Sequence, residues 1–196
     1  MLNEVTKGVY WWRALEVERK RHINGYIFVA KEGLTLVDPP GLPDALVADV
    51  AELDPIKRVI VTGRFQERRA EHFQRCYNAE LYAPQADKRL ILSQADTYFN
   101  AGDKVPGGFT VIEMPNQRTP GECALLHKKS GVLVASHLVG DPPGYIRMRS
   151  EHLYHNFSSA FQAHLPLLEL EFDLILPGMG TPLCHDGRLV LARYLA

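Results

Sequence analysis

Hydrophobic and polar positions along the chain form short blocks, and the first blocks are typical of β-strands. The first strand is rich in aromatic residues, and Glu32-Gly33 supplies a turn between the second and the third. The third strand ends at Asp38. The three expected strands cover residues 9–17, 25–31 and 34–37. Strands in this order predict a β-meander at the start of the fold.

Strands alternate with helices in the rest of the chain. A helix is expected between Pro43 and Pro55, because its apolar residues recur at helical spacing. Further helices are expected at 66–77, 150–172 and 188–195, and further strands at 57–62, 80–82, 109–114, 123–127, 132–135 and 173–176. The segment 177–182 (PGMGTP) is expected to be a loop. A meander followed by strand–helix alternation predicts mixed sheets covered by helices.

Length and composition narrow the class of protein. A chain of 196 residues suffices for one domain, 1–196, with a sizeable core. A net charge of −1 gives no indication of nucleic-acid binding. The three cysteines, Cys76, Cys123 and Cys184, do not form a disulfide framework and are expected to be free and mostly buried. Without a signal-like or membrane-spanning apolar run, a cytoplasmic location is expected.

One segment, VIVTGRFQERRAEHF at residues 59–73, has the pattern of a site. A buried strand runs directly into a polar loop that contains Arg64, Glu67 and Arg68. Polar loops that follow buried strands are where α/β proteins often place their chemistry. The composition of this loop alone does not say which chemistry.

Four stretches resemble, in their order along the chain, the metallo-β-lactamase-fold family. They are NGYIFVAKEGLTLVDPP, VIVTGRFQERRAEHF, TPGECALLHKKSGVLVASHLV and LILPGMGTPL, which together run from residue 24 to residue 183. The resemblance implies an α/β fold, a four-layer αββα sandwich of two mixed β-sheets flanked by helices. It also implies a hydrolytic family that holds one or two metal ions, commonly zinc, in the loops at one edge.

The resemblance places other residues where the family keeps its metal ligands. The family's signature is His-x-His-x-Asp-His after a strand that ends in Thr, and here only Thr62 of that strand end is kept. Asp38 matches a structural or site-supporting aspartate of the family. The positions that correspond to metal ligands are Gly63, Phe65, Glu67, Arg68, Glu122, His137 and Met179.

These substitutions remove most donor atoms that a metal needs. Zinc takes nitrogen, sulfur or carboxylate ligands, and Gly63 and Phe65 offer none. Arg68 stays protonated, and the thioether of Met179 is a poor zinc ligand. No cofactor is therefore expected at the standard site.

The remaining donors leave two hypotheses open. Glu67, Glu122 and His137 could hold a single divalent metal. In the alternative, which we favour, Arg64 and Arg68 neutralise the two glutamates through bidentate hydrogen bonds.

A loop rich in proline, glycine and arginine, residues 140–152, lies next to the same edge. Its Tyr145 and Arg147 join Arg64, Arg68 and Asp38 as candidate contacts for an anionic ligand. The alternative, a surface crossover with solvated arginines, explains the composition slightly better.

Three hypotheses of function follow. The first is a protein without the di-metal site that binds a small ligand, anionic in one version, or a partner, and does not hydrolyse it. The second is a hydrolase with a reworked single-metal site. The third is a scaffold or dimerisation protein with a vestigial pocket, for which a homodimer is considered. We favour the first, in which the protein is not an enzyme.

Overall fold

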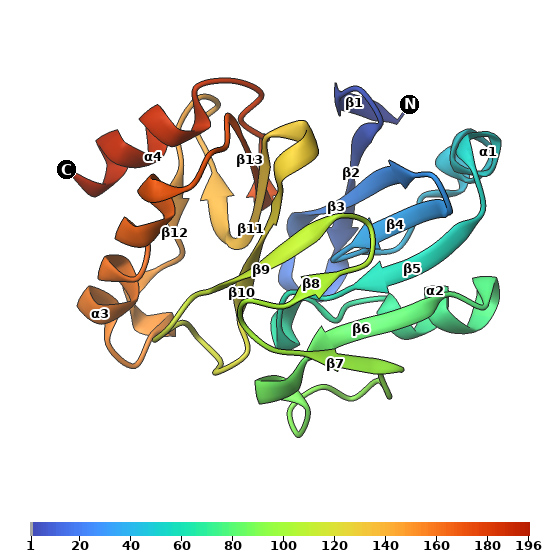
Figure 1. Cartoon of the computed structure of the whole chain (residues 1–196), viewed down its shortest axis with the longest axis horizontal. Coiled ribbons are helices and arrows are strands. Elements are labelled where there is room, and N and C mark those ends of the chain that lie inside the picture. The colour runs from blue at the N-terminus through green and yellow to red at the C-terminus, as the bar shows by residue number, and fades with distance from the viewer. Residues whose placement is uncertain (1) are drawn as a thin grey trace.

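Two β-sheets pack face to face in the computed structural model, which describes residues 2–196, and helices cover their outer faces (Figure 1). This confirms the expected four-layer arrangement. The first sheet has the order β1-β2-β3-β4-β5-β6-β7, antiparallel up to β4 and parallel from β4 to β7. Its strands are β1 (Asn3–Thr6), β2 (Val9–Glu16), β3 (Arg21–Ala30), β4 (Gly33–Val37), β5 (Ile56–Ile60), β6 (Glu80–Pro84) and β7 (Thr97–Phe99).

The second sheet has the order β12-β11-β10-β9-β8, and β13 pairs with β11 in parallel. Its strands are β8 (Lys104–Val105), β9 (Phe109–Glu113), β10 (Cys123–His127), β11 (Val132–Gly140), β12 (Arg147–Met148) and β13 (Leu174–Gly180). Helices α1 (Asp44–Leu53) and α2 (Ala70–Tyr77) cover the first sheet, and α3 (Phe157–Gln162) and α4 (Gly187–Leu195) cover the second.

Three apolar layers hold the sandwich together, and the two-residue period of the strands assigns residues to them. In β3, Phe28 enters the layer between the sheets, whereas Ile27 faces α1 and α2. In the same way Ile60 of β5 lies between the sheets and Val59 faces the helices. Strands buried on both faces explain the continuous apolar runs of the sequence.

Several expected boundaries are wrong for reasons of local backbone geometry. The helix expected from residue 66 begins at Ala70, because Arg68 takes a left-handed φ of 44° that a helix cannot contain. The helix expected over 150–172 is the six-residue α3 with 3₁₀ turns on both sides. Asn156 starts α3 by accepting a hydrogen bond from the Ser159 N–H at 2.9 Å.

Other expectations concerned exposure and loops. Residues 177–180 continue strand β13 instead of forming a loop. Cys123 is buried as expected, but Cys76 and Cys184 are exposed, so the cysteines are not mostly buried. None of the helices within residues 2–196 has the length and apolar character needed to cross a membrane.

Strands β4, β5, β11 and β13 all end at one edge of the sandwich, and this edge carries the candidate site. The two sheets are tied together there by β3. The side-chain amide of Asn24 donates to the carbonyl oxygens of Pro177 and Gly180, each at 2.9 Å, and the Tyr26 hydroxyl also donates to Pro177.

Candidate functional site

The loops after β4 and β5 are joined by a buried aspartate. Asp38 has no solvent-exposed surface, and its two carboxylate oxygens accept from the backbone N–H and the hydroxyl of Thr62, both at 2.7 Å. Burial raises the pKa of Asp38, while the nearby charge of Arg68 favours the carboxylate. Asp38 was a candidate ligand contact, but its oxygens are used inside the protein. It positions the loop that begins at Thr62.

Arg68 points inward and joins three strands of the two sheets. Its guanidinium donates to the backbone carbonyl oxygens of Asn24 and, at 2.7 Å, of Asp38, with a longer contact of 3.4 Å to Gly178. Burial lowers the pKa of Arg68, and Asp38 opposes that shift. The prediction that Arg68 pairs with Glu67 or Glu122 is therefore wrong. Arg68 binds carbonyl oxygens because its left-handed backbone turns it towards β3 and β13.

Glu67 and Arg64 both point away from this cluster. The Glu67 carboxylate accepts from the backbone N–H of Leu92 at 3.0 Å and from both the N–H and the hydroxyl of Ser93. Arg64 is exposed and its guanidinium lies 5.7 Å from the ring of Phe65. Glu67 is thus a tie to the 92–93 loop, and the ion pairs predicted for Arg64 do not form.

Glu122 does form a buried ion pair, but with an arginine that the sequence did not indicate. Arg118 donates from Nη2 to one carboxylate oxygen, and from Nε and its backbone N–H to the other, at 3.1 and 3.2 Å. The side-chain amide of Gln66 adds a donor at 3.1 Å. The Arg118 guanidinium also lies 4.6 Å from the ring of Phe65. Phe65 therefore covers an ion pair at a position where the resemblance would place a ligand.

A third buried carboxylate, Asp87, was not indicated by the sequence analysis. It accepts from the Arg64 backbone N–H at 2.8 Å, from the Thr119 hydroxyl at 2.7 Å and from the Gly121 N–H at 2.8 Å. These bonds fasten the loop after β5 to the loop before β10. Gly63 allows the same close approach, because a Cβ atom there would lie 3.1 Å from the Cα of Glu122.

His137, near the end of β11, pairs with a second histidine. Its Nε2 lies 3.0 Å from Nε2 of His164, whose Nδ1 lies 2.9 Å from the carbonyl oxygen of Ala160. The Nδ1 of His164 must therefore carry its proton, so His137 donates from Nε2 and its Nδ1 holds a lone pair. Burial lowers the pKa of both histidines, and the charges of Arg118 and Arg149 lower that of His137 further.

Arg149 is the second arginine that the structure brings into the site. It is 8% exposed, and its Nη1 lies 2.8 Å from the sulfur of Met179. Its Nε is buried without a hydrogen-bond partner in the part of the chain that the structure describes. Burial, together with the charges of Arg118, Arg21 and Arg68, lowers its pKa to about 9.

The two candidates from the neighbouring loop lie at the surface. Tyr145 is 65% exposed. Arg147 is exposed and its closest carboxylate is that of Asp141, at 3.9 Å. Neither residue contacts the cluster described above. The loop does supply an arginine to the site, but it is Arg149.

A cavity of about 690 Å³ lies beside the cluster. The β2–β3 hairpin forms one wall, the segment 40–43 forms another, and Arg68 and Arg69 complete the lining. Arg68 reaches Gly178 and Arg149 reaches Met179, which are adjacent residues of β13, so the cavity and the buried arginines share one edge of the fold.

Comparison with known proteins agrees with this geometry. The family described as the metallo-beta-lactamase superfamily matches residues 3–195. The chain belongs to the metallo-beta-lactamase superfamily. A search of curated proteins gave no match.

Solved structures of superfamily members share the fold at low sequence identity. The DIM-1 metallo-beta-lactamase is 15% identical over 98% of this chain and 97% of its own, with a TM-score of 0.74. A metallo-beta-lactamase from Hirschia baltica is 17% identical over 100% and 95%, with a TM-score of 0.72. TTHA1623, in a di-iron-bound form, is 18% identical over 88% and 93%, with a TM-score of 0.70.

The residues of this superfamily member do not fit the metal centre that the resemblance implies. Within residues 2–196, no group of three His, Cys, Asp or Glu side chains is arranged to hold a metal ion. The single-metal hypothesis needs Glu67, Glu122 and His137 to face one point. Instead, their side chains bond to Ser93, Arg118 and His164 respectively. A further ligand position, Met179, contacts the cation of Arg149.

Proposed function

We propose that this superfamily member binds a small carboxylate or phosphate at this edge of the sandwich, without a metal and without hydrolysing it. The observation that carries the proposal is the buried guanidinium of Arg149. Among residues 2–196 it contacts a thioether and makes no ion pair. Burial lowers its pKa, and the positive charges of three other arginines lower that pKa further. A buried charge without a counter-ion is costly, so the site favours an anion from solution.

Other buried polar atoms around Arg149 suit such a ligand. The Tyr154 hydroxyl and Nδ1 of His137 are buried and have no hydrogen-bond partner within the described chain. Burial raises the pKa of Tyr154, so its hydroxyl is a donor at neutral pH. An anion oxygen could accept from Arg149 Nε and from Tyr154, and a ligand hydroxyl could donate to His137.

Arg149 keeps its charge under ordinary conditions. A pKa of about 9 leaves the guanidinium protonated at pH 7, and binding of an anion would raise that pKa. Anion binding should therefore weaken as the pH rises through 9. Arg118 contributes less, because Glu122 already neutralises it.

The absence of hydrolysis is proposed from the donor chemistry of the edge. Catalysis in the family depends on metal-activated water, and here glycine, phenylalanine, arginine and methionine stand at four of the ligand positions. The two glutamates and the histidine that remain are bonded elsewhere. What is left is a site that offers fixed positive charge and hydrogen bonds.

Titration calorimetry with acetate, malonate, phosphate and sulfate tests the proposal on protein passed over a chelating resin. We expect at least one anion to bind wild type, Arg149→Gln to lose at least tenfold in affinity, and Arg147→Gln to bind as wild type. Esters, lactones, phosphodiesters and β-lactams are assayed with and without Zn²⁺ or Mn²⁺. Metal-dependent turnover abolished by Glu122→Ala and His137→Ala, or equal binding by both arginine variants, would overturn the proposal.

A further inference from the structure

A second cavity of about 690 Å³ opens at the opposite edge of the sandwich. Four turns form it, namely β1–β2 and β3–β4 from the first sheet and β8–β9 and β10–β11 from the second. Because β4 runs from this edge towards Asp38, and β11 runs from it towards His137, the length of the strands separates the two sites. The volume is in the range of small-molecule sites.

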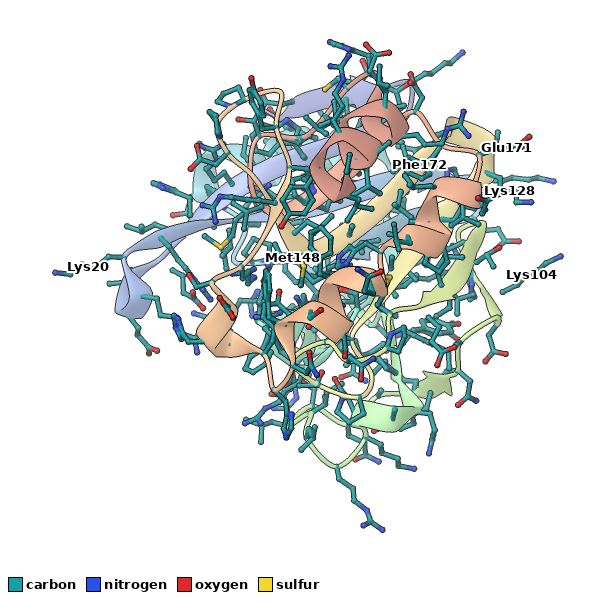
Figure 2. The ribbon with its side chains drawn as sticks, turned by 90° about the vertical axis from the view of Figure 1, so that its left-hand side faces the viewer. Lys20, Lys104, Lys128, Met148, Glu171 and Phe172 are labelled. Carbon is teal, nitrogen blue, oxygen red and sulfur yellow. The ribbon has the colours of Figure 1, made fainter. Side chains whose placement is uncertain are left out.

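Figure 2 shows the two ends of the molecule clearly. Lys20, at the tip of the β2–β3 hairpin beside the first cavity, projects on one side. Lys104 of β8 and Lys128 of the β10–β11 turn project on the other side, where the second cavity lies. Lys20 therefore offers a control position at the end of the molecule that lies away from the second cavity.

Among residues 2–196, the charged side chains that line the second cavity are all lysines. Lys7, Lys31 and Lys129 line it, one from each of three turns. Two glutamates close to these turns in sequence are bonded within the protein, and the partner of Glu4 is Gly8 of the lining itself. Glu32 forms an ion pair with Arg58, and Glu4 accepts from the backbone N–H of Gly8 at 3.1 Å. In the part of the chain that the structure describes, none of the three lysines forms an ion pair.

Two aromatic residues, Phe28 and His127, belong to the lining of the cavity. His127 packs against the rings of Phe28 and Phe109, with ring centroids 5.2 and 5.1 Å away. Its Nδ1 lies 2.6 Å from the Ser130 hydroxyl, which holds the β10–β11 turn in place. A Cβ atom at Gly108 would lie 3.1 Å from Nε2 of His127, so the glycine lets the β8–β9 turn approach this ring. The β10–β11 turn, which carries Lys129, is thus bonded to His127.

We infer that this cavity binds a small polyanion of the phosphate type, such as a compound that carries a pyrophosphate group. A single carboxylate would neutralise only one of the three lysines, whereas a pyrophosphate carries enough charge to face all of them. Lysine ammonium groups bind phosphate as point charges and need no bidentate geometry. The aromatic residues of the lining suit the remainder of such a molecule. This inference is independent of the proposed function at the other edge.

Isothermal titration with sodium pyrophosphate tests the inference on four proteins. These are wild type, the double variant Lys31→Gln/Lys129→Gln, the matched control Lys20→Gln, and Arg149→Gln. All the substituted lysines are exposed, so the fold should be kept. We expect the double variant to bind about tenfold more weakly, at two- to fivefold for each lysine removed. Lys20→Gln should bind as wild type. Arg149→Gln should retain the pyrophosphate binding that depends on Lys31 and Lys129.

The outcomes separate the two sites. Three results would overturn the inference. The first is equal affinity in wild type and the double variant, and the second is an equal loss of affinity in Lys20→Gln. The third is no binding by wild type at pyrophosphate concentrations up to roughly 10 mM, the weakest useful affinity. Loss of pyrophosphate binding in Arg149→Gln alone would assign the anion to the other edge. That result would support the proposed function and contradict this one.

Discussion

Replacing Arg149 with methionine should make the ligand-free protein more stable. Methionine keeps an unbranched, flexible stem and removes the charged guanidinium, so the change combines a lost charge with a shorter side chain. The guanidinium is 8% exposed and has no carboxylate partner in the described chain. A buried charge that its surroundings do not compensate is a position where an apolar residue stabilises.

The lowered pKa sets the size of the effect. The fall of the pKa from the ordinary value of an arginine to about 9 corresponds to a penalty of at most roughly 4–5 kcal/mol on the charged form. Loss of the contact with the Met179 sulfur and imperfect packing should cancel about 1–3 kcal/mol of this. A net gain of about 1–4 kcal/mol remains, which corresponds to roughly 2–16 °C in Tm for a chain of this size.

The sign of the pH dependence provides an internal check. The folded-state pKa of this cation lies below that of the unfolded state, so the penalty is present below pH 9 and disappears as the pH rises above it. The difference between variant and wild type should therefore shrink between pH 7 and pH 10.

Chemical denaturation at these pH values measures the difference. Arg147→Met is the control, because that arginine is exposed two residues away and should change stability by less than about 0.5 kcal/mol. If Arg149→Met were less stable than wild type at pH 7 while the control was neutral, Arg149 would have to be held by a stabilising partner, and our reasoning would fail.

Three further results are expected from the internal ties of the site. Arg68→Met should lower the free energy of unfolding by about 2–4 kcal/mol, because the carbonyl oxygens of Asn24 and Asp38 lose their donor; a loss below 1 kcal/mol in urea denaturation would contradict this. Asp87→Ala should lower the free energy of unfolding by about 2–4 kcal/mol, since three donors lose their shared acceptor. A Tm unchanged from wild type in thermal denaturation would contradict this. Because burial lowers the folded-state pKa of His137 and of its partner histidine, the unfolded state binds protons first, so stability should fall as the pH drops below about 6.5. His137→Gln should flatten that profile, and an equally steep loss in the variant would assign the proton uptake elsewhere.

Most of the architecture could be predicted from the sequence, because it depends on patterns that extend over many residues. Strands buried on both faces leave continuous apolar runs, and the motif order places Thr62 and Arg68 on the correct edge. The boundaries around Ala70 and over 150–172 could not be predicted. They depend on a single left-handed residue and on one capping side chain, which periodicity does not show.

Most hydrogen-bond and ion-pair partners within the site could not be predicted from the sequence. Arg147 and Arg149 belong to the same short segment, and composition alone cannot tell that the first is exposed and the second buried. Arg118 lies four residues before Glu122, but in an irregular loop that spacing does not guarantee contact. Asp87 precedes two of its three hydrogen-bond donors by more than thirty residues. Such pairs are determined by tertiary structure.

The guanidinium of Arg68 has a consequence for how this edge is assembled. It connects β3, the end of β4 and β13 through hydrogen bonds from a side chain of the protein itself. A joint made by a metal ion can be loaded, exchanged or stripped, and its occupancy follows the metal supply of the cell. A connection made by an arginine forms when the chain folds, because each protein molecule carries its own arginine. The two sheets are therefore held together at this edge, in every folded molecule, by hydrogen bonds that need no metal ion.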